Sequence, residues 1–142
     1  MRQSLQPSRD PADYAFAHRL RTRFAETDAM GVIHHGSYLL YLEEARVAYL
    51  RHLGRPYGEV RADGLDIAVL EVSVQYRRPL RFDEEVEVYL WAGAVTRTTF
   101  QIAYLLTVAG DVRATAVTVH GCVDSGGRAA RMPVWVGETF VE

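Results

Sequence analysis

Hydrophobic and polar residues alternate along most of the chain, and only one long stretch departs from this alternation to follow helical spacing. Its apolar positions, spaced by three or four residues, are Tyr38, Leu42, Ala45, Tyr49 and Leu53. Other apolar residues widen this face until only a narrow polar strip is left, which is typical of a helix in a protein interior. The pattern predicts one long buried helix that begins near Gly36 or Ser37 and stops at Gly54.

The rest of the chain alternates with a period of two residues, which predicts strands. The five ranges with this pattern are 16–26, 67–78, 85–92, 98–108 and 113–123. Gly110-Asp111 lies between the last two ranges and predicts a hairpin turn. This order of elements predicts an α+β fold in which one helix packs against one antiparallel sheet. The chain after Arg128 has no clear pattern.

The length of 142 residues and the hydrophobic content of 49% predict a single domain over residues 1–142, with residues 1–14 as a flexible leader. No window approaches the roughly 20 apolar residues of a membrane span, and the first residues lack the apolar core of a signal peptide. We therefore expect a cytoplasmic protein without a membrane span. A net charge of −2 argues against nucleic acid as a partner.

The composition excludes several kinds of chemistry. Cys122 is the only cysteine, so an intrachain disulfide and a cysteine-cluster metal site are excluded. All 16 basic residues are arginine, which excludes a lysine Schiff base and the lysine of a P-loop. His34 and His35 are adjacent and have no third ligand at a suitable spacing, so we expect no metal site.

Asp28 precedes a glycine-containing loop that leads into the predicted helix. The start of a helix presents unpaired backbone N–H groups at the positive end of the helix dipole. A carboxylate opposite such donors suits acyl transfer: the N–H of His35 or Gly36 would form an oxyanion hole, and Asp28 would be the base or the nucleophile. The alternative is that Asp28 only forms a turn or caps a short helix. A Gly-x-Ser-x-Gly nucleophile motif is absent.

Arg46 projects into the apolar arc of the predicted helix. We expect it to pair with Glu43, three residues earlier, with its aliphatic stem packed on the core. A direct contact with substrate is the alternative.

The stretch FAETDAMGVIHHGSYLLYLEEARVAYLRHLG resembles the signature of the 4-hydroxybenzoyl-CoA thioesterase family of the hotdog-fold superfamily. QYRRPLRFDEEVEV resembles the strand segment that follows in that family, and the similarity covers residues 17–125. The resemblance implies a five-stranded antiparallel sheet wrapped around one long helix. It also implies homodimers joined edge to edge, many of which pair into homotetramers. The predicted edge strand Leu65–Tyr76 fits such a dimer, because it is long and carries few charges near its middle.

The resemblance further implies an acyl-CoA thioesterase that hydrolyses a CoA or acyl-carrier-protein thioester without metal or organic cofactor. The family's catalytic aspartate falls on Asp28 and its oxyanion-hole N–H on His35, whose side chain would orient water; Gly36 is the neighbouring donor. Such active sites form at the dimer interface. The residues that would bind the CoA phosphates are Arg77, Arg78 and Arg97, with Thr98 and Thr99 as hydrogen-bond donors.

Several alternatives stay open. Each of these arginines can also be an ordinary surface charge. Glu43 or Glu44 would match a lineage of the superfamily with a catalytic glutamate on the helix, but the loop aspartate fits better. Relatives that dehydrate or hydrate acyl thioesters resemble His-Phe-Pro-Gly or Asp-x-Asn-Pro-x-His motifs, and neither occurs here. A non-catalytic acyl-CoA or acyl-carrier-protein binding module would lack the acid that this chain retains at Asp28.

Overall fold

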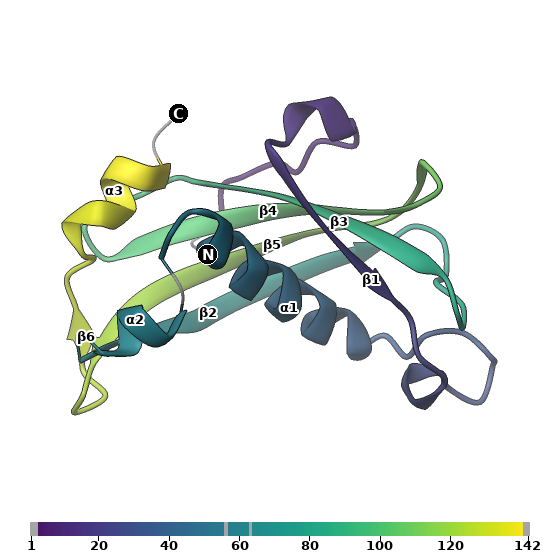
Figure 1. Ribbon diagram of the computed structural model, residues 1–142, viewed down its shortest axis with the longest axis horizontal. Coiled ribbons are helices and arrows are strands. Elements are labelled where there is room, and N and C mark those ends of the chain that lie inside the picture. Colours follow the sequence, from purple (N-terminus) through teal and green to yellow (C-terminus); the bar gives the residue numbers. More distant parts are fainter. Residues whose placement is uncertain (1–2, 56, 63, 141–142) are drawn as a thin grey trace.

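The structure is a computed structural model, and it describes residues 3–55, 57–62 and 64–140. In these residues a long helix lies along one face of a six-stranded sheet (Figure 1). The strands are β1 (Phe16–Arg21), β2 (Leu65–Tyr76), β3 (Glu85–Gly93), β4 (Thr99–Val108), β5 (Asp111–Asp124) and β6 (Ala129–Ala130). The helices are α1 (Ser37–His52), α2 (Tyr57–Ala62) and α3 (Val134–Phe140), with short 3₁₀ turns η1 (Pro11–Asp13) and η2 (Phe24–Glu26).

The strands follow the order β1-β3-β4-β5-β2, and all neighbours are antiparallel. The two-residue strand β6 adds to β5. This confirms the predicted α+β architecture, with five strands in the main path. The strands β1 and β2 form the two long edges, and β2 has a bulge between Val69 and Glu71. Ala109 and Gly110 form the β4–β5 hairpin turn, one residue before the predicted position, and both have positive φ.

The buried side of α1 is the predicted apolar face. Its buried residues are Tyr38, Tyr41, Leu42, Ala45, Tyr49 and Leu50. Gly36 is the N-cap, and α1 ends in a Schellman motif in which Gly54 N–H donates to Arg51 and Arg55 N–H donates to Leu50. Gly54 takes a φ of 77°, which a residue with a side chain rarely adopts, so the predicted stop is confirmed.

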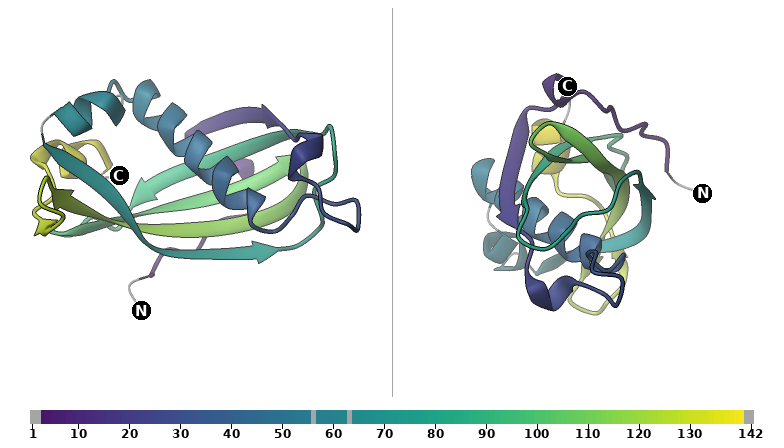
Figure 2. Two further views of the ribbon diagram at one scale, coloured as in Figure 1. Left: turned by 90° about the horizontal axis from the view of Figure 1, so that it is seen from below. Right: turned by 90° about the vertical axis from the view of Figure 1, so that its right-hand side faces the viewer.

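The N-terminal segment crosses the face of the sheet that is turned away from α1 (Figure 2). The backbone N–H groups of Ser4 and Leu5 donate to the buried Gln101 side chain at 2.9 and 3.1 Å. The Tyr14 hydroxyl donates to the Ser8 carbonyl at 2.7 Å. The predicted leader thus makes specific contacts, and its flexibility stays a prediction.

Three sequence predictions differ from the structure. The first strand ends at Arg21 instead of residue 26, because Thr22 turns the chain by bonding to Glu84 and Arg81 and η2 follows. The helix α1 is not the only helix, since α2 and α3 accompany it. The tail without a clear pattern forms β6 and α3, and Phe140 at the end of α3 packs against Phe100 in β4 at 5.1 Å between ring centres.

Candidate functional site

A cavity of about 310 Å³ lies where the loop before α1 meets the end of β2. Its walls are Asp28, Met30, Val32, Ile33, His35, Tyr38, Tyr76, Arg77, Arg78 and Pro79. The cavity therefore brings together the two predicted catalytic residues and two of the predicted CoA-binding arginines. We call it the helix-start pocket.

Asp28 is half-buried and fixed by its own loop. Its Oδ1 accepts hydrogen bonds from the backbone N–H of Met30 at 2.8 Å and of Val32 at 3.3 Å. The backbone N–H of Asp28 donates to the Val32 carbonyl at 2.8 Å, and Gly31 takes a φ of 79° to close the turn. The turn-forming alternative is thus realised through Oδ1. The second oxygen, Oδ2, makes no hydrogen bond with the part of the chain that the structure describes.

The two N–H groups predicted for an oxyanion hole differ in their surroundings. The Gly36 N–H donates to Nδ1 of His34 at 3.0 Å and is therefore occupied. The His35 N–H has no acceptor within residues 3–55, 57–62 and 64–140. Of the two candidates, His35 is the available donor in the helix-start pocket.

Two tyrosines complete the pocket, and neither was among the predicted site residues. The Tyr76 hydroxyl donates to the His35 carbonyl at 2.9 Å. The Tyr38 hydroxyl accepts from the Leu80 N–H at 3.2 Å, and its ring meets that of Tyr76 edge-on at 4.8 Å between centres. Desolvation raises the pKa of both phenols, so each stays protonated near neutral pH. The helical pattern at Tyr38 and the alternating pattern at Tyr76 predicted only that they pack.

Glu26 holds the start of the loop that contains Asp28. Its carboxylate accepts from the Tyr41 hydroxyl at 2.6 Å, from the Arg23 backbone N–H at 2.8 Å, and from the Arg23 guanidinium at 2.7 and 2.9 Å. Burial alone would raise the pKa of this carboxyl, but these hydrogen bonds and the arginine charge lower it overall. The charged Glu26 thereby connects α1 to the turn that precedes Asp28.

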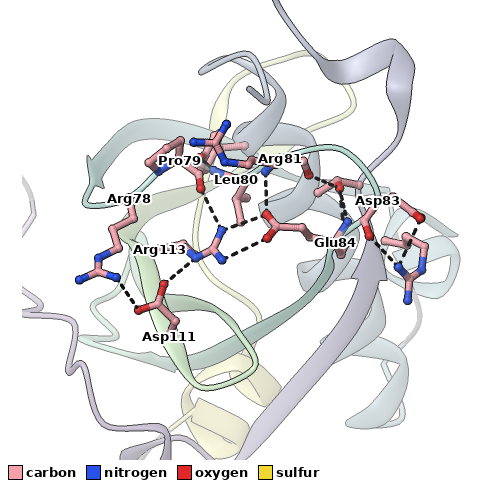
Figure 3. A network of polar contacts seen from close by, with 11 residues as sticks. Arg78, Pro79, Leu80, Arg81, Asp83, Glu84, Asp111 and Arg113 are labelled. Atoms are coloured by element: carbon pink, nitrogen blue, oxygen red, sulfur yellow. Dashed lines mark hydrogen bonds and ion pairs between the residues drawn. The ribbon is translucent and has the colours of Figure 1, made fainter. Parts of the chain in front are cut away.

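A second ionic network anchors the segment 77–84, whose first three residues, Arg77, Arg78 and Pro79, line the pocket (Figure 3). The guanidinium of Arg113 donates to both carboxylate oxygens of Glu84 at 2.9 and 3.1 Å, to Asp111 at 2.8 Å, and to the Pro79 carbonyl at 2.8 Å. Glu84 also accepts from the Arg81 N–H at 2.7 Å. Burial acts to raise the pKa of Glu84, but its hydrogen bonds and the Arg113 charge lower it overall. One arginine at the start of β5 thus fixes the loop that faces Asp28.

The predicted CoA-binding residues fall into two separate groups. Arg77 and Arg78 line the helix-start pocket, and both side chains are exposed. Arg97 and Thr98 line a different hollow beside β6, and Thr99 begins β4 next to them. Thr99 is level with Gly121 in β5 and so with Ala68 in β2, while the pocket is at Tyr76. At ~3.3 Å per residue the two groups lie about 25 Å apart along the sheet.

The rings of His34 and His35 lie 4.2 Å apart between centres, and no cluster of His, Cys, Asp or Glu suited to a metal occurs among the described residues.

Arg46 does not form the predicted pair with Glu43; it donates to the Tyr104 hydroxyl at 3.3 Å instead. Helical spacing allowed the pair with Glu43, but the Arg46 side chain is directed toward the sheet.

Comparison with known proteins identifies the class. The family model described as the thioesterase-like superfamily matches residues 22–140, so the chain belongs to the thioesterase-like superfamily. The predicted thioesterase class and hotdog fold are confirmed. The matching description is broader than the 4-hydroxybenzoyl-CoA branch.

Three proteins illustrate what this chain is similar to. A hypothetical protein from Aquifex aeolicus has a solved structure with a TM-score of 0.85 and 36% identity, covering 89% of this chain and all of that one. The structure of a DHNA-CoA thioesterase from Staphylococcus aureus has a TM-score of 0.78 at 29% identity, covering 81% and 78% of the two chains. The 1,4-dihydroxy-2-naphthoyl-CoA hydrolase of Synechococcus elongatus is 31% identical over 80% of this chain and 84% of its own. Within the described part of this chain, no helix is both long and apolar enough to cross a membrane.

Proposed function

We propose that this protein is an acyl-CoA thioesterase, which hydrolyses an acyl-CoA thioester to a free acid and coenzyme A. One observation carries the proposal: Asp28 and the unoccupied N–H of His35 line the same pocket at the start of α1. The two relatives named as CoA thioester hydrolases support the same reaction class. The cytoplasmic location expected from the sequence is part of this proposal.

The pocket suits a hydrolysis in which the thioester carbonyl oxygen accepts a hydrogen bond from His35 N–H. Asp28 Oδ2 takes a proton from water as the water attacks the carbonyl carbon, while Oδ1 stays held by the Met30 N–H. The tetrahedral intermediate collapses, the C–S bond breaks, and the proton passes to the CoA thiolate. In the alternative, Asp28 attacks the carbonyl carbon, the C–S bond breaks and the CoA thiolate leaves; water then hydrolyses the mixed anhydride, which frees the acid and Asp28 while a proton passes to the thiolate. The His35 side chain would orient the water in either case.

Binding of the CoA phosphates is assigned to arginines. Arg77 and Arg78 border the helix-start pocket of the same subunit. Arg97, Thr98 and Thr99 lie too far along the sheet to serve that pocket, so we assign them to the pocket of a second subunit.

A homodimer would bring the two groups together. The exposed edge strand β2 carries Val69, Leu70 and Val72, all more than two-fifths exposed. A two-fold axis near the middle of β2 would pair this edge with itself and cover the apolar side chains. It would also place the Ala68 end of the partner strand beside Tyr76, on the side of the helix-start pocket. A homotetramer of two such dimers stays a prediction from the resemblance.

The test is thiol release from a panel of acyl-CoA esters by the wild type and by Asp28→Asn. Asparagine keeps an oxygen for the Met30 N–H, so the loop should hold while the base is lost. We expect turnover to fall at least about 10²-fold. Asp124→Asn is the matched control, because Asp124 Oδ1 also accepts two backbone N–H groups, from Gly126 and Arg128, but in a remote turn. Equal turnover of the wild type and a folded Asp28→Asn would reject the proposed role.

A further inference from the structure

A second, larger cavity of about 790 Å³ lies between α1 and the sheet and shares no wall residue with the helix-start pocket. Its walls are mostly apolar and include Val47, Ile67, Val69, Phe100 and Ile102. Cavities of several hundred cubic ångströms with apolar walls and a few polar groups are typical of small-molecule sites. Two polar groups in this wall, Arg46 and His120, lack the partners that such burial normally requires.

Arg46 is half-buried and has no carboxylate within 4.0 Å in the part of the chain described. Among the described residues, its guanidinium makes one hydrogen bond, to the Tyr104 hydroxyl at 3.3 Å. The two glutamates in the same wall do not neutralise it: Glu44 bonds to His18 at 2.6 Å, and Glu43 is exposed. A guanidinium carries five N–H donors, so most of its capacity is available to an anion.

His120 is 1% exposed and ends a chain of hydrogen bonds that starts at Arg46. The Tyr104 hydroxyl and Thr118 Oγ1 lie 2.7 Å apart, and Thr118 Oγ1 lies 2.7 Å from His120 Nε2. Arginine can only donate, so each of these groups is satisfied only if the O–H of Tyr104 points to Thr118 and that of Thr118 points to His120. Nε2 is then an acceptor, and the proton of the neutral ring is on Nδ1.

Nδ1 is the one buried side-chain nitrogen or oxygen without a hydrogen-bond partner among the described residues. Burial and the Arg46 charge lower the pKa of His120 to about 3, against a smaller opposite effect of the Ala68 backbone, so the ring is neutral at physiological pH. An unsatisfied buried donor destabilises the folded protein. The wall thus contains one cation without a carboxylate partner, Arg46, which calls for an acceptor oxygen, and a buried neutral histidine at the other end of its hydrogen-bond chain.

We propose that this cavity binds a small molecule with an apolar body and a carboxylate, with the carboxylate oxygens accepting from the Arg46 guanidinium. The apolar side chains of the wall would hold the body of the ligand. A free carboxylic acid of this kind is also what the proposed thioesterase reaction would release, so the site would retain product if that function holds. Binding itself does not depend on it.

Calorimetric titration with decanoate tests the site directly. We expect saturable binding to the wild type and a dissociation constant at least about tenfold higher in Arg46→Met, the effect of one lost charged hydrogen bond. Arg51→Met is the matched control, because Arg51 is on the same helix and in the same wall but exposed, and it should bind like the wild type. Asp28→Asn should also bind normally, which separates this site from the helix-start pocket.

A measurement on the unmodified protein covers the case in which Arg46→Met fails to fold. Long-range ¹H–¹⁵N correlation of the histidine rings should show His120 with its proton on Nδ1, and decanoate should shift that nitrogen. Three outcomes would overturn the proposal: no change at His120 with saturating decanoate, equal binding of decylamine, which has no acceptor, or unaltered binding to folded Arg46→Met. Loss of self-association in Arg46→Met, with no decanoate binding to the wild type, would assign the cavity to a second copy instead.

Discussion

The Tyr76 hydroxyl donates a hydrogen bond to the carbonyl oxygen of His35 at 2.9 Å, and so joins the end of β2 to the residue that carries the available N–H. The bond holds the His35–Gly36 peptide unit from the sheet, and this unit is adjacent to the one that carries the His35 N–H. Because Tyr76 is itself 49% exposed, this bond contributes more to geometry than to stability.

Replacement of Tyr76 by phenylalanine should lower kcat about two- to tenfold, the equivalent of the about 0.5–1.5 kcal/mol of one hydrogen bond. The melting temperature should stay within a degree or two. Tyr89→Phe removes a hydroxyl from the outer part of β3 and should change neither quantity. An unchanged kcat in Tyr76→Phe would mean that the loop keeps its position without the bond.

Arg113→Gln should destabilise the protein by about 2–4 kcal/mol in urea unfolding, because Glu84 would stay half-buried without its charged partner. Arg19→Gln breaks an ion pair with Glu87 in which the arginine side chain is 70% exposed, and it should cost less than about 1 kcal/mol. We also expect Arg113→Gln to raise KM, because Arg113 bonds to the carbonyl of Pro79, which lines the pocket with Arg77 and Arg78. Equal losses of stability in the two variants would contradict a special contribution of the half-buried network around Arg113.

Acid should lower the stability of the folded protein, in part by protonating Glu26. The pKa of this carboxyl is lower in the folded chain than its ordinary value of 4.5, so the folded state binds its proton less readily. Its contribution is therefore complete above pH 4.5 and is lost as the pH falls through the folded-state pKa. Glu26→Gln should cost about 1–3 kcal/mol at pH 7, and less at pH 3. Unfolding titrations from pH 7 to 3 measure this, with Glu138→Gln in α3 as the control. A constant difference across the range would contradict it.

Leu42→Ala and Leu40→Ala form a matched pair on α1. Leu42 is 1% exposed against the sheet, whereas Leu40 is 56% exposed. Truncation of the buried leucine should cost about 2–5 kcal/mol, and that of the exposed leucine less than about 0.5 kcal/mol. Chemical denaturation distinguishes them; similar values would mean that Leu40 is covered in solution.

Val72→Asp tests the proposed edge-to-edge dimer. A two-fold axis near this residue would bring two aspartates together on an apolar edge, so sedimentation should show a shift toward monomer and a parallel fall in activity. Val134→Asp introduces the same charge at a 78% exposed valine in α3 and should leave assembly unchanged. A fully active monomer, in either the wild type or the variant, would contradict a site shared between subunits.

Local patterns predicted the fold well because hydrophobic residues recur every three or four positions in the helix and every two positions in the strands. The helix from Ser37 to His52 and its stop at Gly54 follow from 3–4 spacing and one glycine, and each of the five main strands was found. The end of β1 was missed because Thr22 continues the alternation, while its hydroxyl bonds to residues some sixty positions away. The alternation carries no information about such a partner.

Only those residues of the candidate site that are close together in the sequence could be predicted. Asp28 and His35 share one loop and a recognisable motif, so the sequence pointed to both. Tyr76 and Arg113 act through residues far away in the chain, and each is in an ordinary strand pattern. Arg97 looked equivalent to Arg77 in sequence, and only the strand register shows that they are at opposite ends of the sheet.

The position of Arg113 also bears on the order in which the molecule assembles. The wall opposite Asp28 depends on a guanidinium that is synthesised more than eighty residues after that aspartate, and contacts of such sequence separation form slowly. The helix and its loop can take shape early, but the substrate-facing hollow is completed only once the last long strand docks. Slow or incomplete docking of that strand would therefore appear as a shortage of active molecules before any loss of helix could be detected.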